Sequence, residues 1–326
     1  MMNNPWEKIS KPQKDLSARR VDHTHPLNLF WAKDHFGNYL LVIEVGKFPE
    51  HRKMELPSLE GIELRPLHAE DDSNGDRLVL LLREQSNWQL FYAICSDIIT
   101  ATKEIDQVIK APEIILGRLL RWQEFLKNKR DRLLSEEKIK GLVGELVFLK
   151  EKLISVFGPQ DSLTFWQGPL GYPQDFSVND TAVEVKAQSG GTAPNVKINS
   201  ANQLSTQLDK LYLHVITLGK STPEDKDSIN LPKLVSDLRF QMQSHSLKAY
   251  VDFNDLLIKY GYIDLEAYEK YNYILSAQTT FEVKDEFPRI CENDLIPGIA
   301  HLVYSISLNA CEGFEGKPDW MEENND

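Results

Sequence analysis

The sequence predicts a mixed α/β protein, α+β overall, in which an amino-terminal and mainly antiparallel β domain precedes a core with the order helix, three strands, helix, strand. Three observations support this prediction. Short apolar runs follow one another over the first 110 residues, a capped helix begins after Leu134, and a hairpin turn lies at Asn179-Asp180. We expect a β-rich domain, a helical linker, a second domain and an acidic disordered tail, at 1–110, 111–133, 134–312 and 313–326.

The composition is that of a globular protein. The chain has 326 residues, 41% of them hydrophobic and 26% charged, enough for two domains of ordinary size. No apolar run reaches the roughly 18 residues needed to cross a bilayer, and the first residues lack the apolar centre of a signal peptide. We therefore expect a cytoplasmic protein without membrane contact. Its three cysteines are far apart, which favours free thiols.

The net charge of −12 argues against a protein that coats nucleic acid through bulk electrostatics, because phosphate contacts need local Lys and Arg. Eight basic residues nevertheless fall between Arg118 and Lys140, against four acidic ones. This stretch is interpreted either as a basic surface or as a solvated helix face.

The first domain is predicted from closely spaced strand patterns. Apolar and β-branched residues are enriched in five short runs, separated by turn residues such as those of His35-Phe36-Gly37-Asn38. The expected strands are 27–34, 38–45, 61–67, 77–84 and 87–95. Two helical patterns follow at 98–110 and 113–129 and are expected to link the domains.

The second domain is predicted to open with a helix from Leu134. Ser135 is a suitable N-cap, and Leu134 and Ile139 occupy the two positions of a hydrophobic staple. Glu145 lies at the border of the apolar stripe. Gly144 costs about 1 kcal/mol relative to Ala in a helix, which is usually accepted where another backbone comes close. The face beside Glu145 is therefore expected to meet the sheet.

The remaining elements complete the predicted order. A short strand at 163–167 precedes the hairpin, and a helix at 200–209 precedes an apolar strand at 211–218. Beyond these, the patterns predict helices and two long strands that pair at a sheet edge. The helices are expected at 231–244, 250–261 and 263–270, and the strands at 271–283 and 299–310.

The hairpin raises a chemical question. A two-residue turn at Asn179-Asp180 pairs Phe176 with Val183 and would place Asp175 opposite Glu184, with Lys186 on the same face. Directly opposed like charges destabilise a sheet by roughly 0.2–1 kcal/mol. A divalent cation is the natural partner for such a pair.

The Glu-x-Lys triplet alone is a weak signal, because it occurs five times. The triplet at Glu184 differs from the others, since it has Asp175 before it across a turn and a helix with Glu145 ahead of both. The other four start at Glu136, Glu224, Glu282 and Glu315 and lack that context.

This arrangement resembles the core of the PD-(D/E)XK nucleases, which have a restriction-endonuclease-like fold. Their metal site combines an Asp with an acidic residue two positions before a Lys. The matching residues are Pro173, Asp175, Glu184 and Lys186, although Gln174 separates the proline from the aspartate.

More closely, the chain is similar to an uncharacterised bacterial family of PD-(D/E)XK proteins found among restriction and phage-defence genes. The similarity runs from about residue 100 to 312, with the amino-terminal region matched only loosely. It is carried by LSEEKIKGLVGEL, Trp166 with Gly168-Pro169, Asp175-Phe176, VEVKAQ, Gln203-Leu204 and FEVKDEFPRI.

The resemblance implies a metal-dependent DNA endonuclease. Asp175, Glu184 and the backbone carbonyl of Val185 would hold Mg²⁺, with Mn²⁺ as an alternative, because these are hard oxygen ligands. Glu145 would bind a second ion or an outer-shell water. Lys186 would hold or deprotonate the attacking water and neutralise the scissile phosphate.

Three further residues are weaker candidates for the substrate site. Gln188 and Gln203 could orient phosphate or water. Lys197 could contact DNA or could be an ordinary surface residue.

The expected substrate is double-stranded DNA, and cutting both strands implies a homodimer or a second nicking protein. An ATPase or a methyltransferase is a possible partner. Two other functions remain open, a catalytically silent docking or DNA-binding subunit of a defence complex and a structure-specific repair or recombination nuclease. The plainer interpretation of the residues is an exposed Glu184–Lys186 ion pair with a solvated Asp175.

Overall fold

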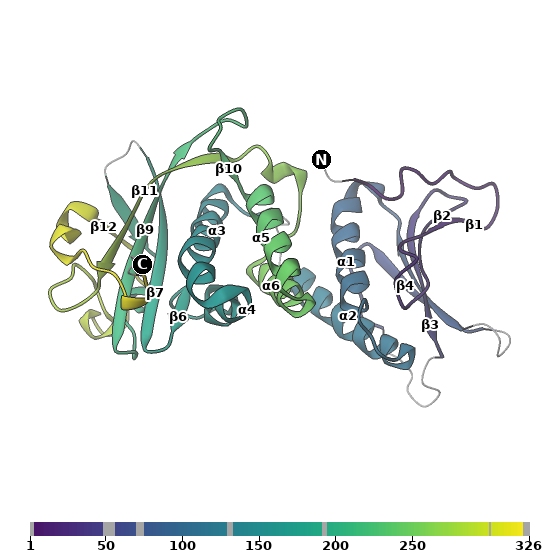
Figure 1. Cartoon of the computed structure of the whole chain (residues 1–326), viewed down its shortest axis with the longest axis horizontal. Coiled ribbons are helices and arrows are strands. Elements are labelled where there is room, and N and C mark those ends of the chain that lie inside the picture. Colours follow the sequence, from purple (N-terminus) through teal and green to yellow (C-terminus); the bar gives the residue numbers. More distant parts are fainter. Residues whose placement is uncertain are drawn as a thin grey trace. The chain divides into compact units, whose positions relative to one another are not determined.

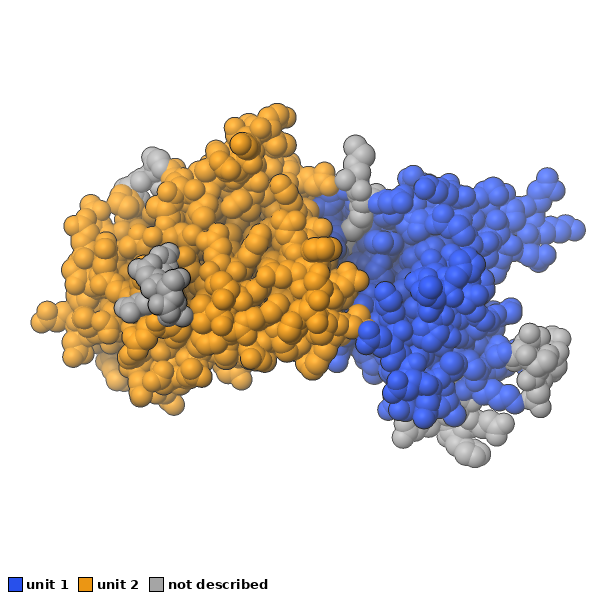
Figure 2. All heavy atoms as spheres, in the orientation of Figure 1, with its two compact units in different colours: residues 1–132, 263–266 blue, residues 133–262, 267–326 orange. Residues whose placement is uncertain are grey.

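The computed structural model describes residues 3–47, 56–69, 75–128, 133–190, 194–299 and 301–321. The chain divides into two compact units (Figure 2). Unit 1 comprises residues 1–132 with 263–266, and unit 2 comprises residues 133–262 with 267–326. The mixture of helices and largely antiparallel sheets confirms the predicted fold class. Within the described ranges, no helix has both the length and the apolar character that a membrane span requires.

Unit 1 is built on a five-stranded antiparallel sheet with the spatial order β1-β2-β3-β5-β4 (Figure 1). Residues on both faces of the central strands are buried, as Leu40 and Leu41 show. The amino-terminal antiparallel region is thus present as predicted. Its strands are β1 (Leu16–Arg20), β2 (Leu29–Asp34), β3 (Tyr39–Gly46), β4 (Ile62–Leu67) and β5 (Asp76–Leu82).

Two helices complete unit 1, and one of them replaces a predicted strand. The segment 87–95 was expected to be extended, but it starts helix α1 (Trp88–Ala101). Its buried residues recur at helical spacing, so the apolar run serves one helix face: Leu90, Phe91, Ile94, Cys95 and Ile98. Only the first four residues of the helix expected at 98–110 are in α1, which ends at Ala101. Helix α2 (Ala111–Asn128) packs against α1 within unit 1.

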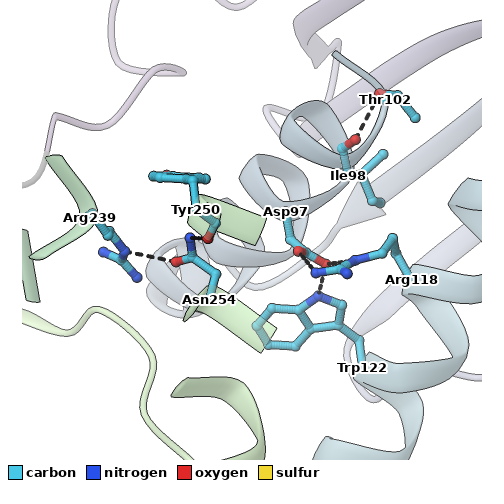
Figure 3. A network of polar contacts seen from close by, with 8 residues as sticks. All are labelled: Asp97, Ile98, Thr102, Arg118, Trp122, Arg239, Tyr250 and Asn254. Atoms are coloured by element: carbon cyan, nitrogen blue, oxygen red, sulfur yellow. Dashed lines mark hydrogen bonds and ion pairs between the residues drawn. The ribbon is translucent and has the colours of Figure 1, made fainter. Parts of the chain in front are cut away.

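A buried ionic cluster joins α1 to α2 (Figure 3). Arg118 forms an ion pair with Asp97, and its Nε donates a hydrogen bond of 2.8 Å to Oδ2 of that residue. Trp122 Nε1 donates a second bond of 2.9 Å to the same oxygen. Arg118 is 6% exposed, so this residue of the basic 118–140 stretch belongs to the interior and not to a charged surface.

Unit 2 contains a five-stranded sheet with the order β10-β11-β9-β7-β6. Strands β7 and β9 run parallel, and the other neighbours are antiparallel. Strands β8 and β12 pair separately. The bounds are β6 (Phe176–Val178), β7 (Thr181–Ser189), β8 (Asn195–Ile198), β9 (Lys210–Lys220), β10 (Ile229–Asn230), β11 (Asn272–Glu282) and β12 (Tyr304–Ser307).

Helix α3 is the element that links the sheet of unit 2 to the other helices (Figure 1). Ser135 caps it by accepting a hydrogen bond from Lys138 N, as predicted. A Cβ at Gly144 would lie 3.3 Å from Ala187 Cβ, so the glycine allows α3 to approach β7 closely. The helices are α3 (Glu136–Phe148), a π-helical turn (Leu149–Leu153), α4 (Ile154–Phe165), α5 (Leu231–His245) and α6 (Leu247–Tyr260).

The opposite face of this sheet carries its own apolar cluster. It joins β7, β8, β9, β11 and β12 through fully buried residues such as Ile198, Leu204 and Leu213. The site residues of β7 therefore lie between two packed layers.

Several elements of unit 2 differ from the prediction. The first three residues of the strand expected at 163–167 form the end of α4, and only Trp166 forms a bridge, to Phe176. The helix expected at 200–209 is reduced to a 3₁₀ turn, η5 (Ala201–Leu204). Gln174 Nε2 donates hydrogen bonds to the carbonyl oxygens of Asn202 at 2.6 Å and Ser205 at 2.9 Å. In a longer helix these carbonyls would accept hydrogen bonds from backbone N–H groups of the helix itself.

The carboxy-terminal region also differs. The helix expected at 263–270 is a 3₁₀ turn at Glu266–Tyr268, and the strand expected at 299–310 is limited to β12, which pairs with β8. Ile299 and Val303 are exposed, so this apolar run is not a buried strand. Residues 313–321 are structured and not a disordered tail, since the Trp320 ring lies 5.8 Å from that of Phe157. Residues 322–326 lie outside the described residues.

Replacing Gly144 with Val should destabilise unit 2 by roughly 1–3 kcal/mol, because the added methyl groups overpack the contact between α3 and β7. The measurement is chemical unfolding followed by tryptophan fluorescence. Gly117→Ala in α2 is the matched control, because no heavy atom lies within 4 Å of the added Cβ. Equal stability of Gly144→Val and the wild type would contradict the close approach.

Candidate active site

The hairpin that carries the site has the predicted register. Phe176 pairs with Val183 and Val178 pairs with Thr181. Asn179 adopts a left-handed conformation with φ of 53°, which Asn tolerates better than most residues. Because side chains alternate along a strand, this turn determines which residues of β7 face the site.

The direct opposition of Asp175 and Glu184 is not formed. The ladder ends at Phe176, and the Asp175 side chain turns back so that Oδ2 accepts a hydrogen bond of 2.8 Å from Val185 N. Its backbone carbonyl accepts bonds from Gln167 N at 2.7 Å and Gly168 N at 3.0 Å. The aspartate thus reaches the β7 backbone by its carboxylate and not by strand pairing.

Glu184 and Lys186 form a buried ion pair and not the exposed pair of the plainer interpretation. Lys186 Nζ lies 2.7 Å from Glu184 Oε1, and the two side chains are 14% and 1% exposed. Lys186 Nζ also donates a hydrogen bond of 3.1 Å to Gln203 Oε1. That oxygen accepts a second bond of 2.7 Å from Asn199 N. Gln203, a weak candidate from sequence, therefore orients the lysine.

Glu145 lies on α3 and is 6% exposed. Its Oε2 accepts a hydrogen bond of 2.7 Å from Trp166 Nε1, and Tyr260 is hydrogen-bonded to the same carboxyl group. A Cβ at Gly168 would lie 2.9 Å from Glu145 Oε2 and 3.0 Å from Asp175 Oδ1. These two carboxylates therefore approach the same point from α3 and from the hairpin.

Burial shifts the pKa values of all three carboxyl groups upward, and repulsion by Asp175 raises those of Glu184 and Glu145 further. The pKa of Glu184 is raised to about 8, mainly by burial and then by the charge of Asp175, against the lowering effect of Lys186. Burial raises the pKa of Asp175 to about 6. Burial and then Asp175 raise the pKa of Glu145 well above its usual range. Burial alone would lower the pKa of Lys186, but Glu184 and Asp175 raise it.

These groups line a cleft of about 770 Å³. Gln188 and Lys197, the other two candidates, also line it. Gln188 Nε2 donates to Thr217 Oγ1 at 2.8 Å, while its buried Oε1 accepts no hydrogen bond from a described residue. Lys197 is on β8 and has a half-exposed side chain, and its Nζ lies 3.5 Å from Glu137 Oε1. All of the predicted site residues therefore face one cleft of unit 2.

The oxygen donors fit a hard divalent cation in type. Glu184 Oε2 is buried and accepts no hydrogen bond from a described residue, and the carboxylates of Asp175 and Glu145 lie near it. Within the described ranges, however, no three His, Cys, Asp or Glu side chains are grouped closely enough to hold a metal ion. Hydrogen bonds to Val185 N and Trp166 Nε1 occupy two of the carboxylates instead.

Sequence reasoning missed three partners of this site. Trp166 was noted only as part of a resemblance, and nothing near Tyr260 in the sequence points to Glu145. In the sequence, Gln174 is notable only because it separates Pro173 from Asp175. In the structure, its side-chain amide donates hydrogen bonds to the backbone carbonyls of Asn202 and Gln203 in η5. Only long-range contacts reveal these roles.

Glu184→Gln should stabilise the metal-free protein more at pH 9 than at pH 5. Wild-type Glu184 keeps its proton up to a pKa of about 8 in the folded chain but loses it near 4.5 when unfolded. The unfolding free energy therefore falls as pH rises between these values, and glutamine removes that loss. The measurement is the melting temperature in EDTA, where each kcal/mol gained corresponds to roughly 2–4 °C.

Ser177→Ala in the same hairpin is the non-titrating control and should follow the wild-type pH dependence. A Glu184→Gln effect that is equal at the two pH values would contradict the buried charge.

The chain matches one family model, which is described as "Putative PD-(D/E)XK family member, (DUF4420)", over residues 2–309. Comparisons with curated proteins and with solved structures find no match. The matched range covers both units and includes the cleft with Asp175, Glu184 and Lys186, in agreement with the resemblance stated from those residues. The chain therefore belongs to the DUF4420 family of PD-(D/E)XK-like proteins.

Proposed function

We propose that this protein is a metal-dependent DNA endonuclease that hydrolyses phosphodiester bonds at the cleft of unit 2. The observation that carries the proposal is the set of Asp175, Glu184 and Lys186 on one hairpin, in which Glu184 is buried and the other two are half-buried. An exposed ion pair would need no such burial, whereas buried carboxylates that repel one another are costly unless something balances them. Membership of a family with a nuclease-like fold supports the same chemistry.

The residues that would hold the cation are Asp175, Glu184 and the backbone carbonyl of Val185, with Glu145 beside them. Mg²⁺ suits this set because it prefers oxygen ligands and keeps several waters, and Mn²⁺ accepts similar ligands. When bound, such an ion lowers the pKa of a water and stabilises negative charge on the phosphate.

Lys186 is the residue best placed to act on the scissile group. Glu184 and Gln203 hold its ammonium group from two sides, so Nζ is oriented before a substrate arrives. From that position it would neutralise the phosphate and hold the attacking water. Gln188, whose Oε1 accepts no hydrogen bond from a described residue, would orient water or phosphate.

The restriction-type or phage-defence setting rests on the resemblance alone. One cleft of this kind cuts one strand, so we infer that double-strand cleavage needs a homodimer or a second nicking protein. An ATPase or methyltransferase partner belongs to the same setting.

Asp175→Ala and Lys186→Ala should each abolish plasmid cleavage, because one removes a cation ligand and the other the positioned ammonium group. The assay is conversion of supercoiled plasmid, methylated and unmethylated, with Mg²⁺ or Mn²⁺. The rate should fall by about 10²–10⁴-fold in Lys186→Ala.

Asp180→Ala is the control, because this carboxylate lies in the exposed turn of the same hairpin. Absence of cutting by the wild type, together with metal binding that Asp175→Ala does not weaken, would contradict the nuclease. It would favour a silent docking subunit instead.

Lys197→Ala should weaken DNA binding without sequence preference. Loss of one phosphate contact reduces the magnitude of the negative slope of log K against log salt concentration by about 1. Binding is measured by fluorescence anisotropy in an Asp175→Ala background, which prevents cutting. Lys226→Ala, an exposed lysine of the 221–228 loop that does not line the cleft, should leave the slope unchanged. A salt slope that Lys197→Ala leaves unchanged would remove this residue from the interface.

A further inference from the structure

Two aromatic donors converge on Glu145 from different helices. Trp166, at the end of α4, is fully buried and donates from Nε1 at 2.7 Å. Tyr260, the last residue of α6, is hydrogen-bonded to the same carboxyl group. Their rings lie 6.4 Å apart, and the Trp166 ring also lies 6.3 Å from that of Phe253. Packing therefore orients both donors before any ligand binds.

Gly168 leaves the space that the Glu145 carboxyl group needs. Gly141, one turn before Glu145 on α3, imposes no such requirement, because a Cβ there would make an ordinary contact of 3.5 Å with the Tyr260 hydroxyl. A Cβ at Gly168 would lie 2.9 Å from Glu145 Oε2, closer than real Cβ contacts. The same Cβ position would lie 3.0 Å from Asp175 Oδ1, so both carboxyl groups border the backbone at Gly168.

A second Trp–carboxylate bond in the same chain gives a comparison. Trp122 donates to Asp97 at 2.9 Å in unit 1, but Arg118 forms an ion pair with that aspartate (Figure 3). No Lys or Arg in the described part of the chain forms an ion pair with Glu145, which also lies near two other carboxylates. The Asp97 cluster pairs one carboxylate with one guanidinium group, whereas the Glu145 cluster places three carboxyl groups beside a single ammonium group, that of Lys186.

We propose that Trp166 and Tyr260 are positioning residues that hold Glu145 toward a divalent cation in the cleft. The inference rests on the proposed function, because it assigns these residues to the same cation site. A packing role alone would explain buried aromatic rings. It would not explain why two donors meet on a carboxyl group that has no ion-pair partner among the described Lys and Arg residues and lies near Asp175.

The test is Mn²⁺ binding, followed by electron paramagnetic resonance, to the full chain and its variants. Tyr260→Phe keeps the ring and removes one donor, and Trp166→Phe removes the other donor while replacing the indole with a smaller aromatic ring. Loss of such an outer partner should weaken Mn²⁺ binding by about 10–100-fold. Trp122→Phe removes the matched bond in unit 1 and should bind Mn²⁺ like the wild type.

A double variant separates positioning from packing. If Trp166 acts through Glu145, then Trp166→Phe combined with Glu145→Gln should bind Mn²⁺ no more weakly than Glu145→Gln alone. Additive losses would overturn the inference. Thermal denaturation shows whether Trp166→Phe is folded. If it is not, Tyr260→Phe, which removes only a hydroxyl group, takes its place in the same comparison.

The remaining outcomes distinguish this inference from the proposed function. Wild-type Mn²⁺ binding that Asp175→Ala abolishes but Trp166→Phe and Tyr260→Phe leave unchanged would overturn the positioning role. The nuclease proposal would stand. No Mn²⁺ binding by the wild type would overturn both.

Discussion

The burial of neighbouring carboxyl groups in unit 2 is the constraint on which the candidate site depends. Glu184 is 1% exposed, and Asp175 raises the pKa of both Glu184 and Glu145. Buried carboxylates persist only where hydrogen bonds, an opposite charge or a cation offset their lost hydration. The Val185 N–H and the Lys186 ammonium supply the first two. A divalent cation would supply the third, which connects the electrostatics of the cleft to the proposed hydrolysis.

The surrounding elements hold one another across long stretches of sequence. Gln174, just before the hairpin, binds the backbone carbonyls around η5. Gln203, within that turn, holds Lys186 on β7. The short turn that replaces the expected helix therefore ties the start of the hairpin to the ammonium group on its second strand. Gly144 brings α3 against the same strand, so Glu145 reaches the site from the other side.

Several local features could be predicted from sequence because neighbouring residues control them. The cap at Ser135, the turn at Asn179 and the pairing of Phe176 with Val183 are of this kind. Other elements were mispredicted where an apolar run fits two periods. The 87–95 run contains β-branched and aromatic residues, but tertiary packing placed it in a helix. The 163–167 run likewise ends α4.

The sequence by itself determined the carboxylates and the lysine of the candidate site, the face of β7 that Glu184 and Lys186 share, and the capped helix that carries Glu145. Tertiary structure alone decided that Asp175 binds the β7 backbone instead of opposing Glu184. It also decided that Trp166 and Tyr260 both reach Glu145. The physical reason is the separation along the sequence over which each kind of interaction acts. Strand alternation and helix capping act over a few residues, whereas these contacts depend on how α3, α4, α6 and the hairpin pack, which no local spacing encodes.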